Sequence, residues 1–95
     1  MDKRVKKPIP SEVAAQRREK FYAEVAQGAL SISEAVVAMR KISRLTQVEF
    51  AKHRGISVQS LKKIEAGSAN PTVETLEKIA DIFGLKIGFV AKGEK

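Results

Sequence analysis

Apolar residues recur every three or four positions through most of this chain, the spacing of a helix with one face on a core. The clearest stripes run through residues 31–43 (Ala35, Val36, Met39, Ile42) and 73–83 (Val73, Leu76, Ile79, Ala80, Phe83). A thinner stripe of Val13, Phe21 and Val25 is interrupted by Arg17. It predicts a helix over residues 11–27, ended by Gly28, that packs only in part.

Hydroxyl residues mark where the helices begin. "SISE" (Ser31 to Glu34) and "TQVE" (Thr46 to Glu49) both have the spacing of a capping box, in which a Ser or Thr and a Glu three residues later satisfy each other's backbone N–H groups. Ser57 and Thr72 are further caps. The predicted helices therefore run over residues 31–43, from Thr46 to about His53, from Ser57 to about Ala66, and over residues 73–83.

The two middle helices are short, and helices of this length are marginal in water when isolated. Their apolar residues are Phe50 and Ala51 in the first helix, and Leu61 and Ile64 in the second. A small residue such as Ala51 lets two helices cross closely, and Gly55 supplies the positive φ of a tight turn. This combination predicts a helix-turn-helix, whose second helix enters the major groove of DNA.

The two ends differ from this helical middle. Residues 1–10 are basic, hold two prolines and predict a disordered arm. At the other end, Leu85, Ile87 and Phe89 alternate to one face as in a β-strand. The predicted organisation is an arm (1–10), an accessory helix (11–30), a helix-turn-helix domain (31–84), and a dimerisation strand with a tail (85–95).

Charge is unevenly distributed along the chain, whose net charge is +7. Residues 31–66 carry seven basic and three acidic side chains, a net of +4, whereas residues 67–84 carry one basic and three acidic, a net of −2. Such polarity suits a polyanion on one side of the molecule. Solubility alone is the other explanation of the same charges.

The composition argues against several classes of protein. The chain has no cysteine and a single histidine, His53, so catalytic thiols and Cys- or His-based metal sites are not supported. No glycine-rich phosphate loop or recognisable pair of catalytic carboxylates is present, and we expect neither an enzyme nor a cofactor. No apolar run approaches membrane-spanning length, and the N-terminus is not a signal peptide, so we expect a cytoplasmic protein without membrane contact.

The sequence resembles the Cro and lambda-repressor-like (XRE-type) helix-turn-helix proteins. The resemblance covers roughly residues 35–84 and is carried by "LTQVEFA", "GIS", "SLKKIEAG" and "NPTVETLEKIA". It implies a mainly all-α bundle, here with an extra N-terminal helix and a short C-terminal β-strand that pairs across a dimer. Arg54 departs from the family, because the residue before the turn glycine is usually apolar.

The resemblance also implies roles for single residues. Gln47 matches a glutamine that hydrogen-bonds a DNA phosphate and braces the recognition helix. Arg40 and Glu65 match a structural ion pair between the first and third helices of the domain. The alternative for both charges is simple solvation.

The outward residues of the recognition helix have side chains that suit DNA. Gln59 can bond adenine, Val58 can contact a thymine methyl group, and Lys62 or Lys63 can bond guanine or a phosphate. We expect Val58 and Gln59 to read bases and one of the two lysines to contact phosphate, although both lysines could serve only to neutralise phosphates. By resemblance, Ser60, Ser68 and Asn70 are further backbone-contacting candidates.

The leading hypothesis is a sequence-specific regulator that binds double-stranded DNA and represses transcription as a homodimer on a palindromic operator. In this reading Leu85, Ile87 and Phe89 form the dimerisation strand, whereas the alternative packs the tail on its own domain. A second hypothesis is an antitoxin that neutralises a hip-type, kinase-like toxin and regulates its own operon. The N-terminal helix would then touch flanking DNA, dock a partner, or have no function. An adaptor that bridges proteins is a further alternative.

Overall fold

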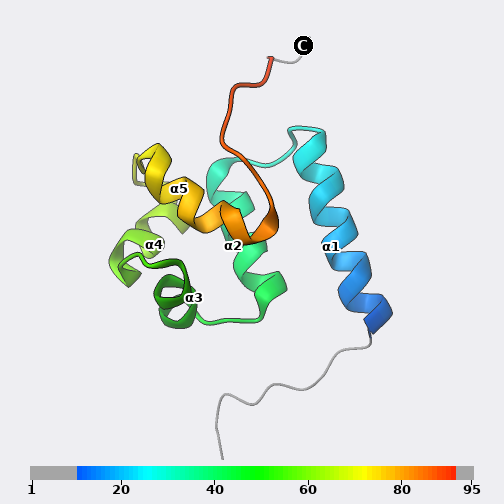
Figure 1. Ribbon diagram of the computed structural model, residues 1–95, viewed down its shortest axis with the longest axis horizontal. Coiled ribbons are helices and arrows are strands. Elements are labelled where there is room, and N and C mark those ends of the chain that lie inside the picture. The colour runs from blue at the N-terminus through cyan, green and yellow to red at the C-terminus, as the bar shows by residue number, and fades with distance from the viewer. Residues whose placement is uncertain (1–10, 92–95) are drawn as a thin grey trace, which may run out of the picture.

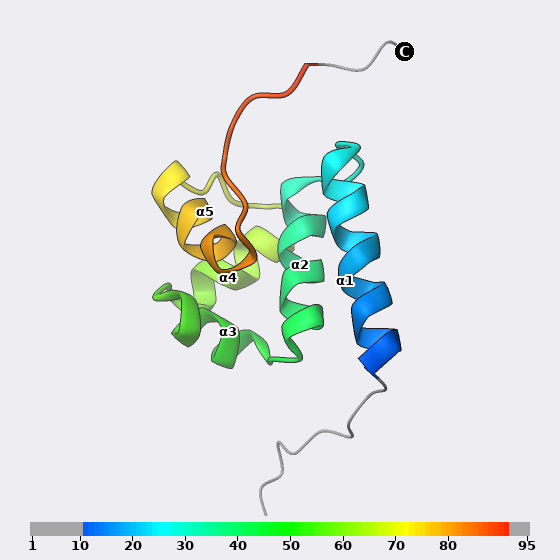
Figure 2. The same cartoon turned by 45° about the vertical axis from the view of Figure 1, so that its right-hand side comes forward.

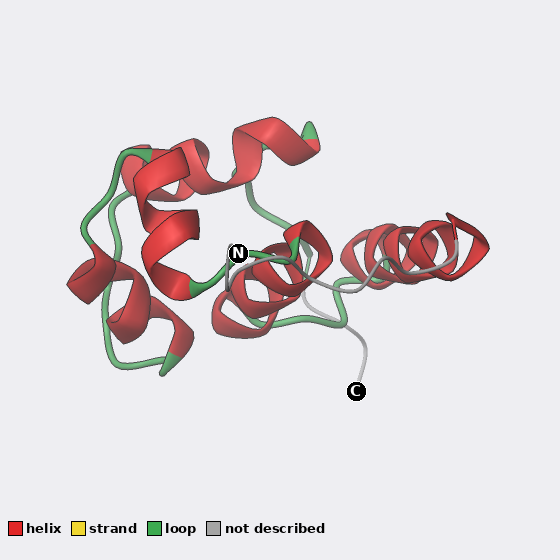
Figure 3. Cartoon of the chain, turned by 90° about the horizontal axis from the view of Figure 1, so that it is seen from below, coloured by secondary structure: helices red, strands yellow, loops and turns green. Residues whose placement is uncertain are grey.

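The computed structural model describes residues 11–91, which form five α-helices and one short 3₁₀-helix (Figures 1 and 3). The predicted basic arm of residues 1–10 and the last residues of the tail, 92–95, lie outside the described residues. The helices are α1 (Ser11–Ala26), α2 (Ile32–Ser43), α3 (Gln47–Arg54), α4 (Val58–Glu65), α5 (Val73–Ala80) and the 3₁₀-helix η1 (Asp81–Phe83).

Both predicted capping boxes are present. At the start of α2, the backbone N–H of Glu34 donates to Ser31 Oγ at 3.1 Å, and Glu34 Oε1 accepts from the backbone N–H of Ser31 at 2.9 Å. Thr46 and Glu49 repeat the arrangement at the start of α3. Each box satisfies two backbone donors that a helix terminus leaves without partners, which fixes where the helix begins.

The core lies where α2, α3, α4 and α5 meet. Phe50, Leu61 and Ile79 are its largest fully enclosed side chains, and Val36, Met39 and Ile64 surround them. Ala51 is also buried, as expected for the small residue at the crossing of α3 and α4. These apolar residues are the ones that the helical spacing selected, so the sequence pattern predicted the core correctly.

Helix α1 lies along the side of α2 that faces away from α3 and α4 (Figures 1 and 2). Phe21 is buried, and Val25 packs against the core. The ring of Phe21 makes edge contacts with Tyr22 and Phe83, and the Tyr22 hydroxyl donates to the Phe83 carbonyl oxygen at 2.8 Å. The C-terminal half of α1 therefore holds the end of η1 in place.

The predicted helix over residues 73–83 changes character before its end. Its last three residues form η1, a tighter 3₁₀ turn that ends at Gly84 with φ of +69°. Val73 was expected on the apolar stripe, but it is 56% exposed. It is the first residue of α5, and that end of α5 lies at the edge of the molecule (Figure 1).

The predicted C-terminal β-strand is not present in the single chain. Residues 85–91 have no regular secondary structure and extend away from the helices (Figures 1 and 2), and residues 11–91 contain no strand at all. A strand is defined by hydrogen bonds to a second strand, and no neighbouring segment of this range offers an edge to pair with. Leu85 packs against the core, whereas Ile87 and Phe89 are exposed.

Candidate nucleic-acid interface

Helices α3 and α4 form the helix-turn-helix. Gly55, with φ of +70°, ends α3, and the backbone N–H of Ile56 donates to the Ala51 carbonyl oxygen at 3.0 Å. Ser57 then caps α4 by accepting from the backbone N–H of Ser60 at 3.0 Å. With Leu61 and Ile64 buried, one side of α4 is fixed to the core and the other side faces outward.

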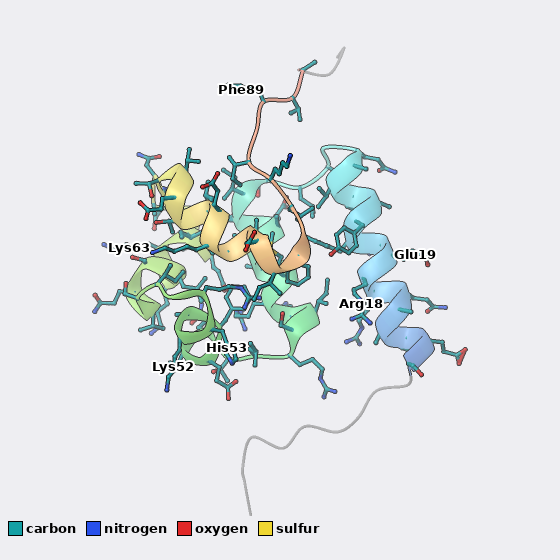
Figure 4. The ribbon with its side chains drawn as sticks, viewed as in Figure 1. Arg18, Glu19, Lys52, His53, Lys63 and Phe89 are labelled. Carbon is teal, nitrogen blue, oxygen red and sulfur yellow. The ribbon has the colours of Figure 1, made fainter. Side chains whose placement is uncertain are left out.

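The outward side of α4 carries Gln59, Lys62 and Lys63, which are all exposed. Residues three and four positions apart lie on the same face of a helix, so these three side chains form one row, the α4 row. Figure 4 shows Lys63 projecting from the side of the molecule opposite α1, with Lys52 and His53 of α3 on the same half. The row thus offers two ammonium groups and one amide to a partner on this side.

The remaining predicted DNA contacts are less uniform. Val58 is half-buried and packs partly against the core, so only part of its side chain is open to a base. The Ser60 hydroxyl accepts a hydrogen bond from the Ser57 hydroxyl at 3.0 Å. Ser68 and Asn70 are both exposed on the loop after α4, where the Ser68 hydroxyl donates weakly to the Lys63 carbonyl oxygen at 3.4 Å.

A polar network ties α4 to the helices before it. Arg40 of α2 donates from Nε to Glu65 Oε2 at 2.7 Å and from Nη2 to Glu65 Oε1 at 3.0 Å, a bidentate ion pair. Gln47 at the start of α3 donates to the same Oε1 atom at 3.0 Å. Arg40 also donates from Nη1 to the Leu45 carbonyl oxygen at 3.2 Å. Three helices therefore meet at the Glu65 carboxylate.

The expected contact between Arg40 and Glu65 is thus present, and Gln47, which was expected to brace the recognition helix, is bonded to Glu65 at the end of α4. Gln47 was expected to bond a phosphate, but in the protein alone it is half-buried and bound to Glu65. An amide nitrogen carries two hydrogens, and this bond uses one of them. No spacing rule in the sequence links residues 47 and 65, so the bond could not be found without the fold.

The network shifts the pKa of both charged partners. The hydrogen bond to Glu65 raises the pKa of Arg40, against the opposing effect of burial. Burial, the largest single effect, raises the pKa of Glu65, but the hydrogen bonds from Arg40 and Gln47 together with the positive charges of Arg40 and Lys41 outweigh it, so the pKa of Glu65 lies below its usual value of 4.5. The pair is therefore charged at neutral pH. Both oxygens of the Glu65 carboxylate accept hydrogen bonds that tie α4 to α2 and α3.

Residues 11–91 offer neither a metal site nor a membrane-spanning helix. This part of the chain holds no group of three or more His, Asp or Glu side chains arranged to bind a metal ion. None of its helices is both long enough and apolar enough to cross a membrane.

Comparison with known proteins agrees with this geometry. A family model described as helix-turn-helix matches residues 37–90, more than half of the chain. The chain belongs to the XRE-type helix-turn-helix family. The resemblance drawn from the sequence motifs is thereby confirmed. No solved structure matches the chain at a significant level.

The relatives of this chain include proteins named as repressors and as an antitoxin. The chain is 41% identical over 58 residues to the cryptic phage CTXphi transcriptional repressor RstR of Vibrio cholerae, an alignment that covers 61% of this chain and 52% of the relative. It is 31% identical over 65 residues to the immunity repressor protein of Bacillus phage phi105, covering 68% and 45%. Antitoxin HigA1 of Mycobacterium tuberculosis is 29% identical over 82 residues, covering 86% and 55%. The chain spans about half the length of these relatives.

Proposed function

We propose that this protein is a sequence-specific DNA-binding regulator that represses transcription as a dimer on a palindromic operator. The observation that carries the proposal is the α4 row: Gln59, Lys62 and Lys63 are exposed on the second helix of a helix-turn-helix. The opposite side of that helix is anchored by buried Leu61 and Ile64 and by the Glu65 network. Base reading in the major groove requires a helix that is fixed in orientation and exposes polar side chains.

The chemistry of each side chain suggests its role. The Gln59 amide can make two hydrogen bonds to adenine, and the ammonium groups of Lys62 and Lys63 suit phosphate or guanine. Val58 contributes the exposed part of its side chain to a thymine methyl group. The remaining donors, namely the second amide hydrogen of Gln47 and the side chains of Ser60, Ser68 and Asn70, are proposed to contact the DNA backbone and to set the register of α4.

A dimer follows from the length of the site. One helix reads only a few base pairs, and two-fold dimers extend the site by binding half-sites about 34–36 Å apart. Residues 86–91 make no backbone hydrogen bond to another described residue, so their N–H and C=O groups are open to pairing. We propose that two such tails pair as an antiparallel ribbon, which forms the predicted strand only in the dimer.

The test uses operator duplexes selected from a randomised library by the full chain, with fluorescence anisotropy as the readout. Gln59→Ala should weaken binding to the operator by about 1–3 kcal/mol and leave random DNA nearly unchanged. Lys63→Gln should weaken binding to both the operator and random DNA. It should also reduce the salt dependence of the binding constant by about one released counterion. The matched control is Gln16→Ala, the same substitution at an exposed position of α1, which should leave both affinities unchanged. Equal losses on operator and random DNA for Gln59→Ala would refute base reading.

An antitoxin is the second candidate, favoured by one observation. The HigA1 alignment spans 82 residues of this 95-residue chain, so it necessarily includes most of α1, which lies outside the matched family model. In this reading the protein neutralises a toxin, of the hip-type kinase-like class, and represses its own operon. Expression of the product of a neighbouring gene should then arrest growth. Co-expression of this protein should restore growth, and so should co-expression of its Gln59→Ala variant. Absence of any rescue counts against this candidate.

A further inference from the structure

An apolar groove of about 340 Å³ lies where the end of α1, the start of α2, α5 and the tail of residues 85–91 come together. We call it the tail groove. Its walls include Val25, Leu30, Ile32, Leu76, Leu85 and Ile87. A cavity of about 150 Å³ lined by apolar side chains is enough to bind benzene, so the tail groove has room for a phenyl ring.

The tail itself carries such a ring in an unfavourable place. Phe89 is fully exposed, and Figure 4 shows it far from the helices, on the segment that leaves the body. Val90 and Ile82 are also largely exposed. Burial of an aromatic side chain is among the larger contributions to an interface, so a fully exposed phenylalanine on a chain that also carries an apolar groove indicates a docking surface.

Symmetry determines where this ring would go in a dimer. In an antiparallel pair of identical strands, residue numbers facing each other have a constant sum. With the two-fold axis at Ile87, the middle of the three alternating apolar residues, Phe89 of a second copy faces Leu85. Because Leu85 packs against the core and lines the tail groove, that ring arrives at the groove.

We propose that the tail groove receives Phe89 of a second copy, and that α1 is therefore part of the dimer interface. This inference rests on the dimer proposed above and assigns a function to a helix that lies outside the matched family segment. The contacts on α1 support it. The hydrogen bond from Tyr22 to Phe83 and the ring contact between Phe21 and Phe83 join α1 to the residue just before the tail begins, which fixes the groove wall relative to the tail.

Ile32→Glu tests the groove without disturbing the fold. Ile32 lines the groove, is 54% exposed, and is the first residue of α2, where a carboxylate interacts favourably with the helix dipole. The matched control is Val73→Glu, since Val73 is 56% exposed and is the first residue of α5, but does not line the groove. Sedimentation equilibrium on the full chain should show a dimer weakened by about a hundredfold for Ile32→Glu and unchanged for Val73→Glu.

Two further variants separate the groove from the ribbon. Phe89→Ser should weaken the dimer about as much as Ile32→Glu, while truncation after Gly84 should abolish it. If truncation abolishes the dimer and Ile32→Glu does not weaken it, the groove assignment is overturned and the ribbon of the proposed function stands. If Ile32→Glu and Val73→Glu weaken the dimer equally, the groove assignment is also overturned, because the added negative charge alone would then explain the weaker dimer.

The remaining outcome concerns a different occupant. If the unaltered chain stays monomeric at all accessible concentrations, both the groove assignment and the proposed dimer fail. The DNA-binding test with Gln59→Ala is read independently of this result. Binding of another protein that is lost in Ile32→Glu, with no dimer of this chain, would assign the groove to that partner and overturn the second copy as its occupant.

Discussion

Arg54 is a charged residue buried in the domain, with 7% of its surface exposed. It stands directly before the turn glycine, where the family usually places an apolar residue. Its guanidinium carbon lies 4.3 Å from the centroid of the Phe50 ring, a cation–π contact, but its Nε atom has no hydrogen-bond partner. Burial also lowers the pKa of Arg54, because removal from water disfavours the charged form. The buried, charged guanidinium of Arg54 therefore lowers the stability of the fold.

Arg54→Met should therefore stabilise the fold. An unpaired buried donor costs about 1–3 kcal/mol and a desolvated cation–π contact returns about 2 kcal/mol, whereas a thioether side chain packs on Phe50 with neither an unsatisfied donor nor a charge to desolvate. We expect a gain near 1 kcal/mol. In a domain of this size this corresponds to a rise of about 4–8 °C in Tm, measured by circular dichroism.

The matched control is Lys52→Met, which removes an exposed positive charge from the same helix and should change Tm little. A lower Tm for Arg54→Met would contradict the account, because it would mean that the guanidinium contributes more through Phe50 than its unpaired nitrogen costs.

At the scale of the elements, the Glu65 carboxylate connects α2, α3 and α4. It accepts two bonds from Arg40 and one from Gln47, and its side chain is nearly enclosed, with 7% exposed, beside Arg40 with 19%. Removing one partner of such a pair leaves the other charge in a partly dry site. The orientation of α4 thus depends on this ionised group as well as on the buried side chains of Leu61 and Ile64.

This dependence should appear in the pH profile of stability. The pKa of Glu65 is lower in the folded protein than its ordinary value of 4.5, so its contribution is fully present above about pH 4.5 and is lost as pH falls through the folded pKa. Glu65→Gln should lower the free energy of unfolding by about 2 kcal/mol at pH 7. The difference between the two proteins should shrink as the pH is lowered below 4.5, as measured by urea unfolding.

Glu77→Gln serves as the control, since Glu77 is exposed on α5 and should show almost no difference from the unaltered protein at pH 7. A loss for Glu65→Gln that is the same at pH 7 and pH 3 would show that the carboxylate acts through packing and not through its charge.

Helix boundaries were predictable because their signals are local. The capping boxes at Ser31 and Thr46 and the turn at Gly55 each involve residues within four positions, and their structures agree with the sequence reading. The exposure of Val73, the bond from Gln47 to Glu65, and the tail groove each depend on which elements meet in space. A strand at residues 85–90 depends on a second strand to pair with, which is why the single chain does not show it.

For the whole molecule, the placement of α1 limits what it can do. It lies across α2 from α3 and α4, so its residues Arg18 and Glu19 are on the opposite side from Lys63 (Figure 4). Helix α1 therefore does not share the surface proposed for DNA, and the basic residues of that proposed surface are those of α3 and α4. The exposed ammonium groups of Lys52, Lys62 and Lys63 then supply a local positive field at the proposed interface.

Such an interface makes binding strongly dependent on salt. If a dimer neutralises about six phosphates, its affinity should fall by about three decades between about 50 and 200 mM salt. This loss applies to every duplex, because phosphates carry no sequence information, while the contacts of the α4 row apply only to the operator.

The central claim is that α4 reads DNA sequence, and the most direct measurement is the affinity of the full chain for a library-selected duplex and for a scrambled duplex of the same composition. Fluorescence anisotropy at about 50 and 200 mM salt gives both affinities and their salt dependence. The account predicts a two-fold symmetric selected site, bound more tightly than the scrambled duplex at both salt concentrations. Equal affinities that fall together with salt would contradict it, because charge alone would then explain the binding.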